Sequence, residues 1–316
     1  MVTAAQKLDA LYPETRGSDA SQCTRSHLAD QLALRPQCGR SAVSRAPMRL
    51  HKNCDHRPVQ IIAVDWSGKA KGPEESLWRA EVRDGRLIEL RNGLDRGELI
   101  AKLLELGEAE PSTVIGLDFA FSFPAWWCEK NGWSSAEDVW SAMARGGEDL
   151  LAGCEAPFWG RPGKRNPHPK ARLYRRTEIS EDAVRPKSVF QIGGAGAVGT
   201  GSVRGMPHLL TLAKNGFGIW PFSEGWPRVV EIYPRALTGP VNKGKWSARN
   251  DYLVERFPEQ PRDILERAAG SEDAFDAAVS ALVMSEHEAE LRVLGPLADP
   301  AYGIEGNIWR PKRLRC

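Results

Sequence analysis

Two short runs of aliphatic residues, each ending in an aspartate, constrain the fold of this chain more than any other feature. Residues 59–65 read VQIIAVD and residues 113–118 read TVIGLD. Runs of this length and composition predict strands buried on both faces, which is typical of a sheet covered by helices on each side. An ionised carboxylate at the end of such a strand is costly unless it is paired or binds a cation. We therefore expect an α/β protein with acidic groups at one edge of its sheet.

The remaining pattern predicts a mixed sheet with flanking helices. Residues 77–83 alternate in polarity, and the Asp84-Gly85 turn leads into a second strand, as in a hairpin. Asp95 is placed to cap a helix over 95–108. Two further strands are expected at 218–222 and 228–233, and further helices at 122–146, 203–215, 247–256, 260–269 and 271–289.

Acidic residues are the candidate catalytic and metal-binding groups. Asp65, Asp118 and Glu231 each lie at or near the carboxyl end of a predicted central strand, where α/β sheets bind ligands. Asp276 lies in an alanine-rich helix that can approach the sheet closely, with Asp273 three residues earlier on the same face. Converging carboxylates repel one another unless cations neutralise them, and oxygen ligands suit Mg²⁺ or Mn²⁺. Two such ions hydrolyse phosphodiesters by activating water and stabilising the leaving oxygen.

Each acid also has a purely structural interpretation. Asp65 and Asp118 could cap the turns that follow them or pair with an arginine. Glu231 could form a salt bridge with Arg235, four residues along the chain. Asp273 is favoured in a first helical turn by the helix dipole alone, so Asp276 is the stronger candidate of the two.

The charge distribution points to an anionic partner. The chain carries a net charge of +2, but residues 1–58 contribute +4 and residues 161–187 contribute +6, which leaves −8 for the rest. Cations beside aromatic side chains suit a nucleic-acid groove, and the alternative is a solvated loop that balances the acidic body. The candidate nucleic-acid-binding residues are Arg161, Lys164, Arg165, Lys170, Arg172, Arg175 and Arg176.

A glycine-rich segment follows the basic one. Gly194, Gly196 and Gly199 have the spacing of a dinucleotide-binding loop. Too little chain surrounds them for a complete Rossmann sheet, and no acid stands about 20 residues further on, so no nicotinamide cofactor is expected. We expect instead a loop that offers backbone N–H groups to a phosphate.

Four motifs together resemble an uncharacterised prokaryotic domain family of predicted nucleases with the ribonuclease H-like fold. They are Val64-Asp-Trp-Ser-Gly68, Gly116-Leu-Asp-Phe-Ala-Phe-Ser-Phe-Pro124, Glu231-Ile-Tyr-Pro234 and Asp273-Ala-Phe-Asp-Ala-Ala278. The resemblance covers residues 59–310 and implies a five-stranded mixed sheet flanked by helices. It further implies that Asp65 anchors the metal, with Asp118, Glu231 and Asp276 as its partners.

The predicted organisation is one ribonuclease H-like domain over residues 58–316, with a basic, loop-rich insertion at about 150–205. Residues 1–57 hold one aromatic residue and are expected to form a disordered basic extension. The six cysteines lack a C-x-x-C pair, so free thiols are expected. No run reaches the length of a membrane span and the start lacks a secretory signal, so a cytoplasmic location is expected.

The predicted function is metal-dependent hydrolysis of phosphodiester bonds in DNA or RNA, with two Mg²⁺ or Mn²⁺ ions held by carboxylates. One alternative is an ATP-dependent phosphotransferase or ATPase of the actin-like type, which requires a duplicated domain. The other is a catalytically inactive module that binds nucleic acid.

Overall fold

The computed structural model describes residues 59–166, 168–169, 172–179 and 186–312. All of them belong to one compact unit, Asp55–Cys316. The predicted extension over residues 1–57 and the candidate Lys170 lie outside the described residues.

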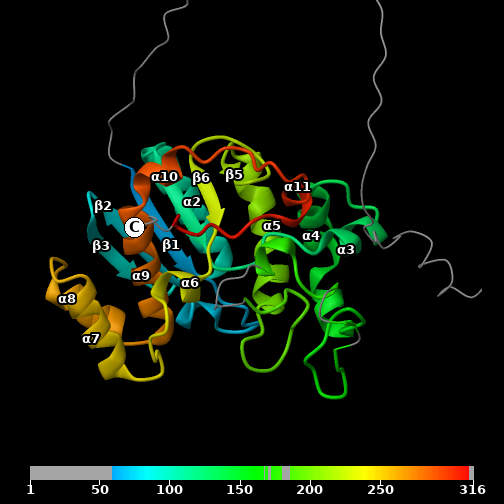
Figure 1. Cartoon of the computed structure of the whole chain (residues 1–316), viewed down its shortest axis with the longest axis horizontal. Coiled ribbons are helices and arrows are strands. Elements are labelled where there is room, and N and C mark those ends of the chain that lie inside the picture. Colours follow the sequence, from blue (N-terminus) through cyan, green and yellow to red (C-terminus); the bar gives the residue numbers. More distant parts are fainter. Residues whose placement is uncertain (1–58, 167, 170–171, 180–185, 313–316) are drawn as a thin grey trace, which may run out of the picture. The chain divides into compact units, whose positions relative to one another are not determined.

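A mixed six-stranded sheet forms the centre of this unit (Figure 1). Its strands are β1 (Gln60–Asp65), β2 (Trp78–Arg83), β3 (Arg86–Arg91), β4 (Thr113–Leu117), β5 (Gly218–Ile219) and β6 (Arg228–Glu231). The strand order is β3-β2-β1-β4-β6-β5. Strand β2 is antiparallel to β1 and β3, whereas β1, β4, β6 and β5 are mutually parallel.

The predicted mixed α/β architecture is confirmed, but the sheet has six strands where the family resemblance implied five. The additional edge strand, β5, spans only two residues and pairs with Arg228 and Val229 of β6. It is shorter than the predicted strand at 218–222 because Pro221 has no N–H to continue the ladder.

Helices cover both faces of the sheet. They are η1 (Pro73–Glu75), α2 (Arg96–Ala109), α3 (Ala125–Lys130), α4 (Ala136–Gly153), η3 (Arg176–Glu178), α5 (Gly199–Lys214), α6 (Pro234–Thr238), α7 (Trp246–Arg256), α8 (Arg262–Ala269), α9 (Glu272–Glu286), α10 (Glu288–Arg292) and α11 (Tyr302–Glu305). The single helix expected over 122–146 is two helices, because Ser135 starts α4 with a capping box. In the described part of the chain, no helix combines the length and the apolar character needed to cross a bilayer.

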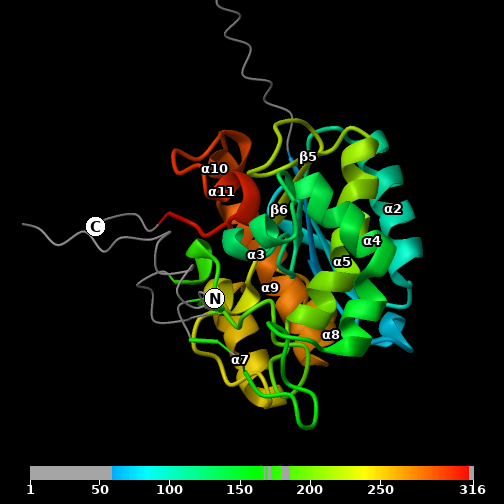
Figure 2. The same ribbon diagram turned by 90° about the vertical axis from the view of Figure 1, so that its right-hand side faces the viewer.

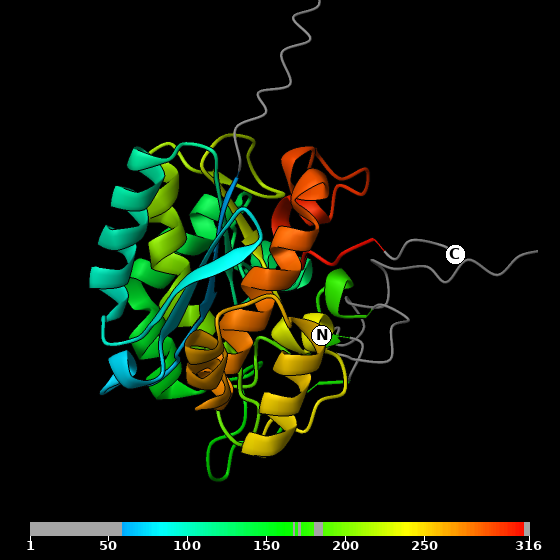
Figure 3. The same ribbon diagram turned by 90° about the vertical axis from the view of Figure 1, so that its left-hand side faces the viewer.

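The two faces of the sheet carry different helices (Figures 2 and 3). Helices α2, α4 and α5 contribute to the hydrophobic core on one face. Helix α9 packs on β1, β2 and β3 on the other face, and α6 and α8 pack against α9. The small residues Ala277, Ala278 and Ala281 are fully buried, which allows α9 to approach the strands closely.

Strand alternation assigns each side chain to one of these faces. In β1, Ile61 and Ala63 belong to the core on the α9 face, and Ile62 and Val64 belong to the core on the α2 face. In β4, Gly116 lies under α9, where an added Cβ would approach the Met284 sulfur to 2.6 Å. The parity of each strand therefore decides which acidic side chains can meet.

Candidate functional site

Asp65 and Asp118 lie side by side at the carboxyl ends of two adjacent parallel strands. Val64 of β1 pairs with Leu117 of β4, and the Asp118 N–H donates to the Val64 carbonyl at 3.1 Å. The residue after each partner is an aspartate, and alternation directs both side chains to the α9 face. Among the described residues, neither carboxylate accepts a hydrogen bond.

Helix α9 brings a third carboxylate to the same edge. Ser271 caps the helix by accepting a hydrogen bond from the Ala274 N–H at 3.0 Å. Asp276 lies one turn further on and is 9% exposed. Its Oδ2 accepts a hydrogen bond from the ammonium of Lys243, whereas its Oδ1 is buried without a hydrogen-bond partner. A bare buried carboxylate oxygen is costly, so this atom is a candidate ligand for a cation.

The pKa values show that these carboxyls act on one another. Burial raises the pKa of Asp65 well above its usual range, and the charges of Asp118, Asp276 and Asp273 raise it further. Burial followed by the charge of Asp276 likewise raises the pKa of Asp118 well above its usual range. Burial raises the pKa of Asp276 to about 6, against the opposing effect of Lys243. The site is thus a region of mutual repulsion that an added cation would relieve.

Asp273 lies at the margin of this cluster. It is partly exposed in the first turn of α9, and its pKa is raised by burial. Lys69 and Lys243 both oppose that rise. Its charge acts on Asp65 and Asp276 but is not among the influences on Asp118, so Asp276 is the more central of the two acids.

Glu231 does not lie in the cluster as a free carboxylate, although its charge contributes to the raised pKa of Asp118. It faces the opposite side of the sheet, because Val230 before it and Ile232 after it both belong to the α9 core. Arg175 binds its two oxygens at 2.5 and 2.8 Å, and the Phe121 N–H donates to it at 2.9 Å. Glu231 is therefore a buried structural ion-pair partner.

Arg235, the partner considered for Glu231 from the sequence, makes a different contact. Its guanidinium donates to the Val241 carbonyl at 2.7 Å. Arg235 thus holds the loop after α6, and the ion pair of Glu231 comes from a residue 56 positions earlier in the chain.

The basic segment divides into surface residues and one buried residue. Arg175 has a side chain only 1% exposed and cannot contact a polymer, so it is removed from the predicted nucleic-acid-binding set. Lys164 and Arg176 are exposed and form ion pairs with Glu155 and Asp299. The other described members are exposed: Arg161, Arg165 and Arg172.

In the predicted phosphate loop, the last glycine, Gly199, has a structural role. Gly194 and Gly196 adopt left-handed φ values of 80° and 72°. Gly199 begins α5, and its N–H donates to the Gln191 carbonyl at 2.9 Å. An added Cβ on Gly199 would lie 2.2 Å from the Val189 oxygen. Gly199 is thus needed for packing, and its N–H is not available to a phosphate.

The start of α5 nevertheless lies beside the site. An added Cβ on Gly68, three residues after Asp65, would lie 2.7 Å from the Gly201 nitrogen. Ser202 accepts a hydrogen bond from the Ala120 N–H at 3.0 Å, two residues after Asp118. Helix α5 therefore supports the turns that follow both aspartates.

Two basic residues of this site, Lys243 and Arg249, are not indicated by the sequence pattern. Lys243 is the partner of Asp276, and it lies in the loop between α6 and α7. Arg249 is buried and donates to the Lys243 carbonyl and, at 2.8 Å, to the Ala269 carbonyl. The only available signal was the pair of lysines around Gly244, which does not indicate a buried contact.

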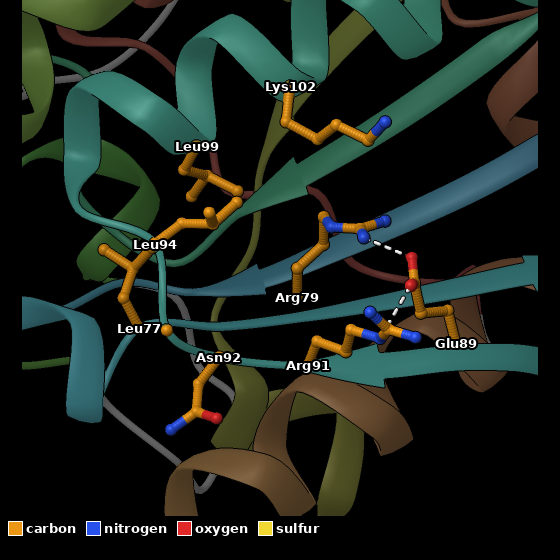
Figure 4. Close-up of a pocket in the computed structure, with 9 residues that line it drawn as sticks. Leu77, Arg79, Glu89, Arg91, Asn92, Leu94, Leu99 and Lys102 are labelled. Atoms are coloured by element: carbon orange, nitrogen blue, oxygen red, sulfur yellow. Dashed lines mark hydrogen bonds and ion pairs between the residues drawn. The ribbon is translucent and has the colours of Figure 1, made fainter.

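A cavity of about 340 Å³ lies elsewhere, between β2, β3 and α2 (Figure 4). Leu77 and Leu99, which line it, belong to the core on the α2 face, so it lies on the opposite face from the carboxylate cluster. Arg79 and Arg91 both pair with Glu89 at its side. Lys102, the third cation of the lining, pairs with Glu105, so each of the three lining cations has a carboxylate partner.

The three central carboxylates suit a hard divalent cation by their chemistry. Within the ranges that the structure describes, however, no group of three or more Asp, Glu, His or Cys side chains is arranged to hold a metal ion. The Lys243 ammonium already occupies one oxygen of Asp276. No family model, no curated protein and no solved structure matches the chain.

Proposed function

We propose that this protein is a nuclease that hydrolyses phosphodiester bonds with the help of Mg²⁺ or Mn²⁺. The observation that carries the proposal is the meeting of Asp65, Asp118 and Asp276 at one sheet edge, with the Asp276 Oδ1 buried and unpartnered. The pKa values of all three carboxyls are raised, so their ionised forms are destabilised at this site, and a bound divalent cation would stabilise them.

These three residues would hold the ions. Bound there, a pair of divalent cations supplies an activated water and stabilises the leaving oxygen. The chain provides the rigidity, because two ligands project from adjacent parallel strands and the third from a 15-residue helix. Glu231 has no part in this set, since Arg175 and Phe121 already bind its oxygens.

The ribonuclease H-like identity of the fold is part of the same proposal. An antiparallel meander, β1 to β3, is followed by β4 and β6, which add in parallel to the other side of β1. This arrangement agrees with the mixed five-stranded sheet that the family resemblance implies, with β5 as a two-residue addition at the edge.

Exposed cations of the insertion support a nucleic acid as the substrate. Figure 1 shows loops between α4 and α5 on the side of the sheet where β1 and β6 end. Arg161, Arg165 and Arg172 of this segment are exposed, and the Arg172 guanidinium lies 6.0 Å from the centroid of the Trp126 ring. The actin-like alternative requires two such domains, and the described residues form one sheet.

The test is cleavage of labelled single-stranded, duplex and branched DNA and RNA in Mg²⁺ or Mn²⁺. Asp65→Asn keeps the side-chain shape and removes the charge, so we expect it to fold and to lose cleavage by at least a hundredfold. Asp251→Asn, on the exposed face of α7, is the matched control and should cleave like wild type.

Cleavage that persists in Asp65→Asn would contradict the proposed site. Turnover of ATP without cleavage of any polymer would favour the phosphotransferase. Binding of nucleic acid without either reaction would identify an inactive binding module.

A further inference from the structure

The loop between α6 and α7 is built to direct one lysine at the carboxylate cluster. Arg249 is 6% exposed, and its guanidinium holds the Lys243 carbonyl together with the Ala269 carbonyl. The Lys243 N–H donates to the Val241 carbonyl at 3.1 Å. Both backbone groups of Lys243 are therefore bound, and the start of its side chain is positioned before it reaches Asp276.

The Lys243 ammonium serves more than one carboxylate. Its side chain is 18% exposed and pairs directly with Asp276, whose side chain is 12% exposed. Its positive charge also opposes the raised pKa values of Asp65, Asp118 and Asp273. Among the described residues, Lys243 is the one cation whose charge acts on all four of these acids.

We propose that Lys243 is a tethered counter-ion of the metal-free site, and that a divalent cation binds by displacing its ammonium from Asp276. This inference rests on the proposed function, because it concerns the same carboxylates. The contact that must break is the one between the Lys243 ammonium and Oδ2 of Asp276. The bare Oδ1 of Asp276 offers the incoming cation its first contact, and release of Lys243 frees Oδ2.

Competition between the ammonium and the metal has a measurable consequence. The Lys243 ammonium and the divalent cation cannot bind Asp276 at the same time. An interaction that stabilises the lysine-bound state therefore lowers the affinity for the cation by the same factor. Removing the ammonium should therefore tighten metal binding and destabilise the metal-free protein. A lysine that contacted only substrate would leave the affinity for the metal alone unchanged.

The experiment compares Lys243→Met with Lys245→Met in the full chain. Lys245 is exposed two residues away, so both variants remove one positive charge from the same loop. Mn²⁺ binding is measured by isothermal titration, and thermal unfolding is followed in EDTA. We expect Lys243→Met to bind Mn²⁺ at least tenfold more tightly and to unfold at a lower temperature in EDTA. Lys245→Met should change the affinity less than twofold.

Other outcomes overturn the inference in distinguishable ways. Equal or weaker Mn²⁺ affinity in Lys243→Met, with clear binding by wild type, refutes the displacement and leaves the proposed function standing. Equal tightening in both variants shows a general charge effect and refutes it as well. If neither wild type nor any variant binds Mn²⁺, both the displacement of Lys243 and the proposed metal-dependent function are refuted. If Lys243→Met does not fold, Lys243→Gln keeps an amide donor and replaces it in the same comparison.

Discussion

Arg175 is the residue at which structure and sequence pattern disagree most sharply, and its replacement by methionine tests the corrected interpretation. Its guanidinium donates to both oxygens of Glu231 at 2.5 and 2.8 Å, to Glu178 at 2.9 Å and to the Glu305 carbonyl at 3.0 Å. Although burial lowers the pKa of Arg175, the charges of Glu231 and Glu178 raise it above its ordinary value. The arginine therefore remains charged inside the protein.

The magnitude follows from what Arg175→Met leaves behind. Methionine fills much of the same volume but leaves two carboxylates without their counter-charge, and both are buried. Removal of one partner of a buried ion pair costs about 3–5 kcal/mol. We expect a loss of that size at pH 7. The loss should shrink at acidic pH, because burial raises the pKa of Glu178 and its protonation removes one of the uncompensated charges.

Urea unfolding at pH 7 measures the effect, with Arg176→Met as the control. Arg176 is the next residue in the chain, but its side chain is 59% exposed and its ion pair with Asp299 lies at the surface. Exposed pairs contribute about 0–1 kcal/mol, so the control should lose little. Equal losses in the two variants, or a loss below about 1 kcal/mol for Arg175→Met, would refute the structural assignment of Arg175 and Glu231.

Two further predictions concern the carboxylate site and the helix that carries it. Because the pKa of Asp276 is raised to about 6 in the folded protein, the native state binds more protons than the unfolded state between about pH 4 and 6. The free energy of unfolding of wild type should therefore fall by about 3 kcal/mol relative to that of Asp276→Asn as the pH rises through this range. Thermal unfolding of both proteins in EDTA measures this change. A difference in stability that does not vary with pH would contradict the prediction. Gly116→Ala places a Cβ 2.6 Å from the Met284 sulfur and 2.9 Å from Ile232, so we expect overpacking to cost about 1–3 kcal/mol in urea unfolding. At Gly146 no atom lies within 4 Å of an added Cβ, so Gly146→Ala should instead stabilise α4 by about 0.5–1 kcal/mol. If both variants changed the free energy of unfolding in the same direction, close packing of α9 on β4 would be contradicted.

Local pattern predicted much of the fold because the responsible interactions are local. Asp95 and Glu98 form the capping box that starts α2, and both residues are within one helical turn. The Asp84-Gly85 turn joins β2 to β3 as expected, with positive φ at both residues. The helix expected over 122–146 was divided because Ser135 offers its own cap, a signal that hydrophobic spacing alone does not weigh.

The candidate site was predicted in part for the same reason. Asp65 and Asp118 end strands of matching character, so neighbouring parallel strands bring them together whatever the remainder of the fold. Asp276 could be chosen from the small residues beside it, which permit a close approach to the sheet. Arg175 and Lys243 could not be assigned, because their partners lie 56 and 33 positions away and a basic side chain in a loop gives no sign of burial.

The sequence by itself determined that this chain folds around buried strands whose ends carry acids, because strand composition and turn residues act over a few positions. Only the tertiary structure decided which of those acids meet. A shift of one residue in strand parity sends a side chain to the opposite face, and this places Glu231 with Arg175 and away from Asp65. The tertiary structure also brings Lys243 to the site, because the buried Arg249 binds the loop between α6 and α7 that carries this lysine. Burial and charge pairing across the chain are properties of the packed molecule, and they decide which carboxylates remain free to bind a cation.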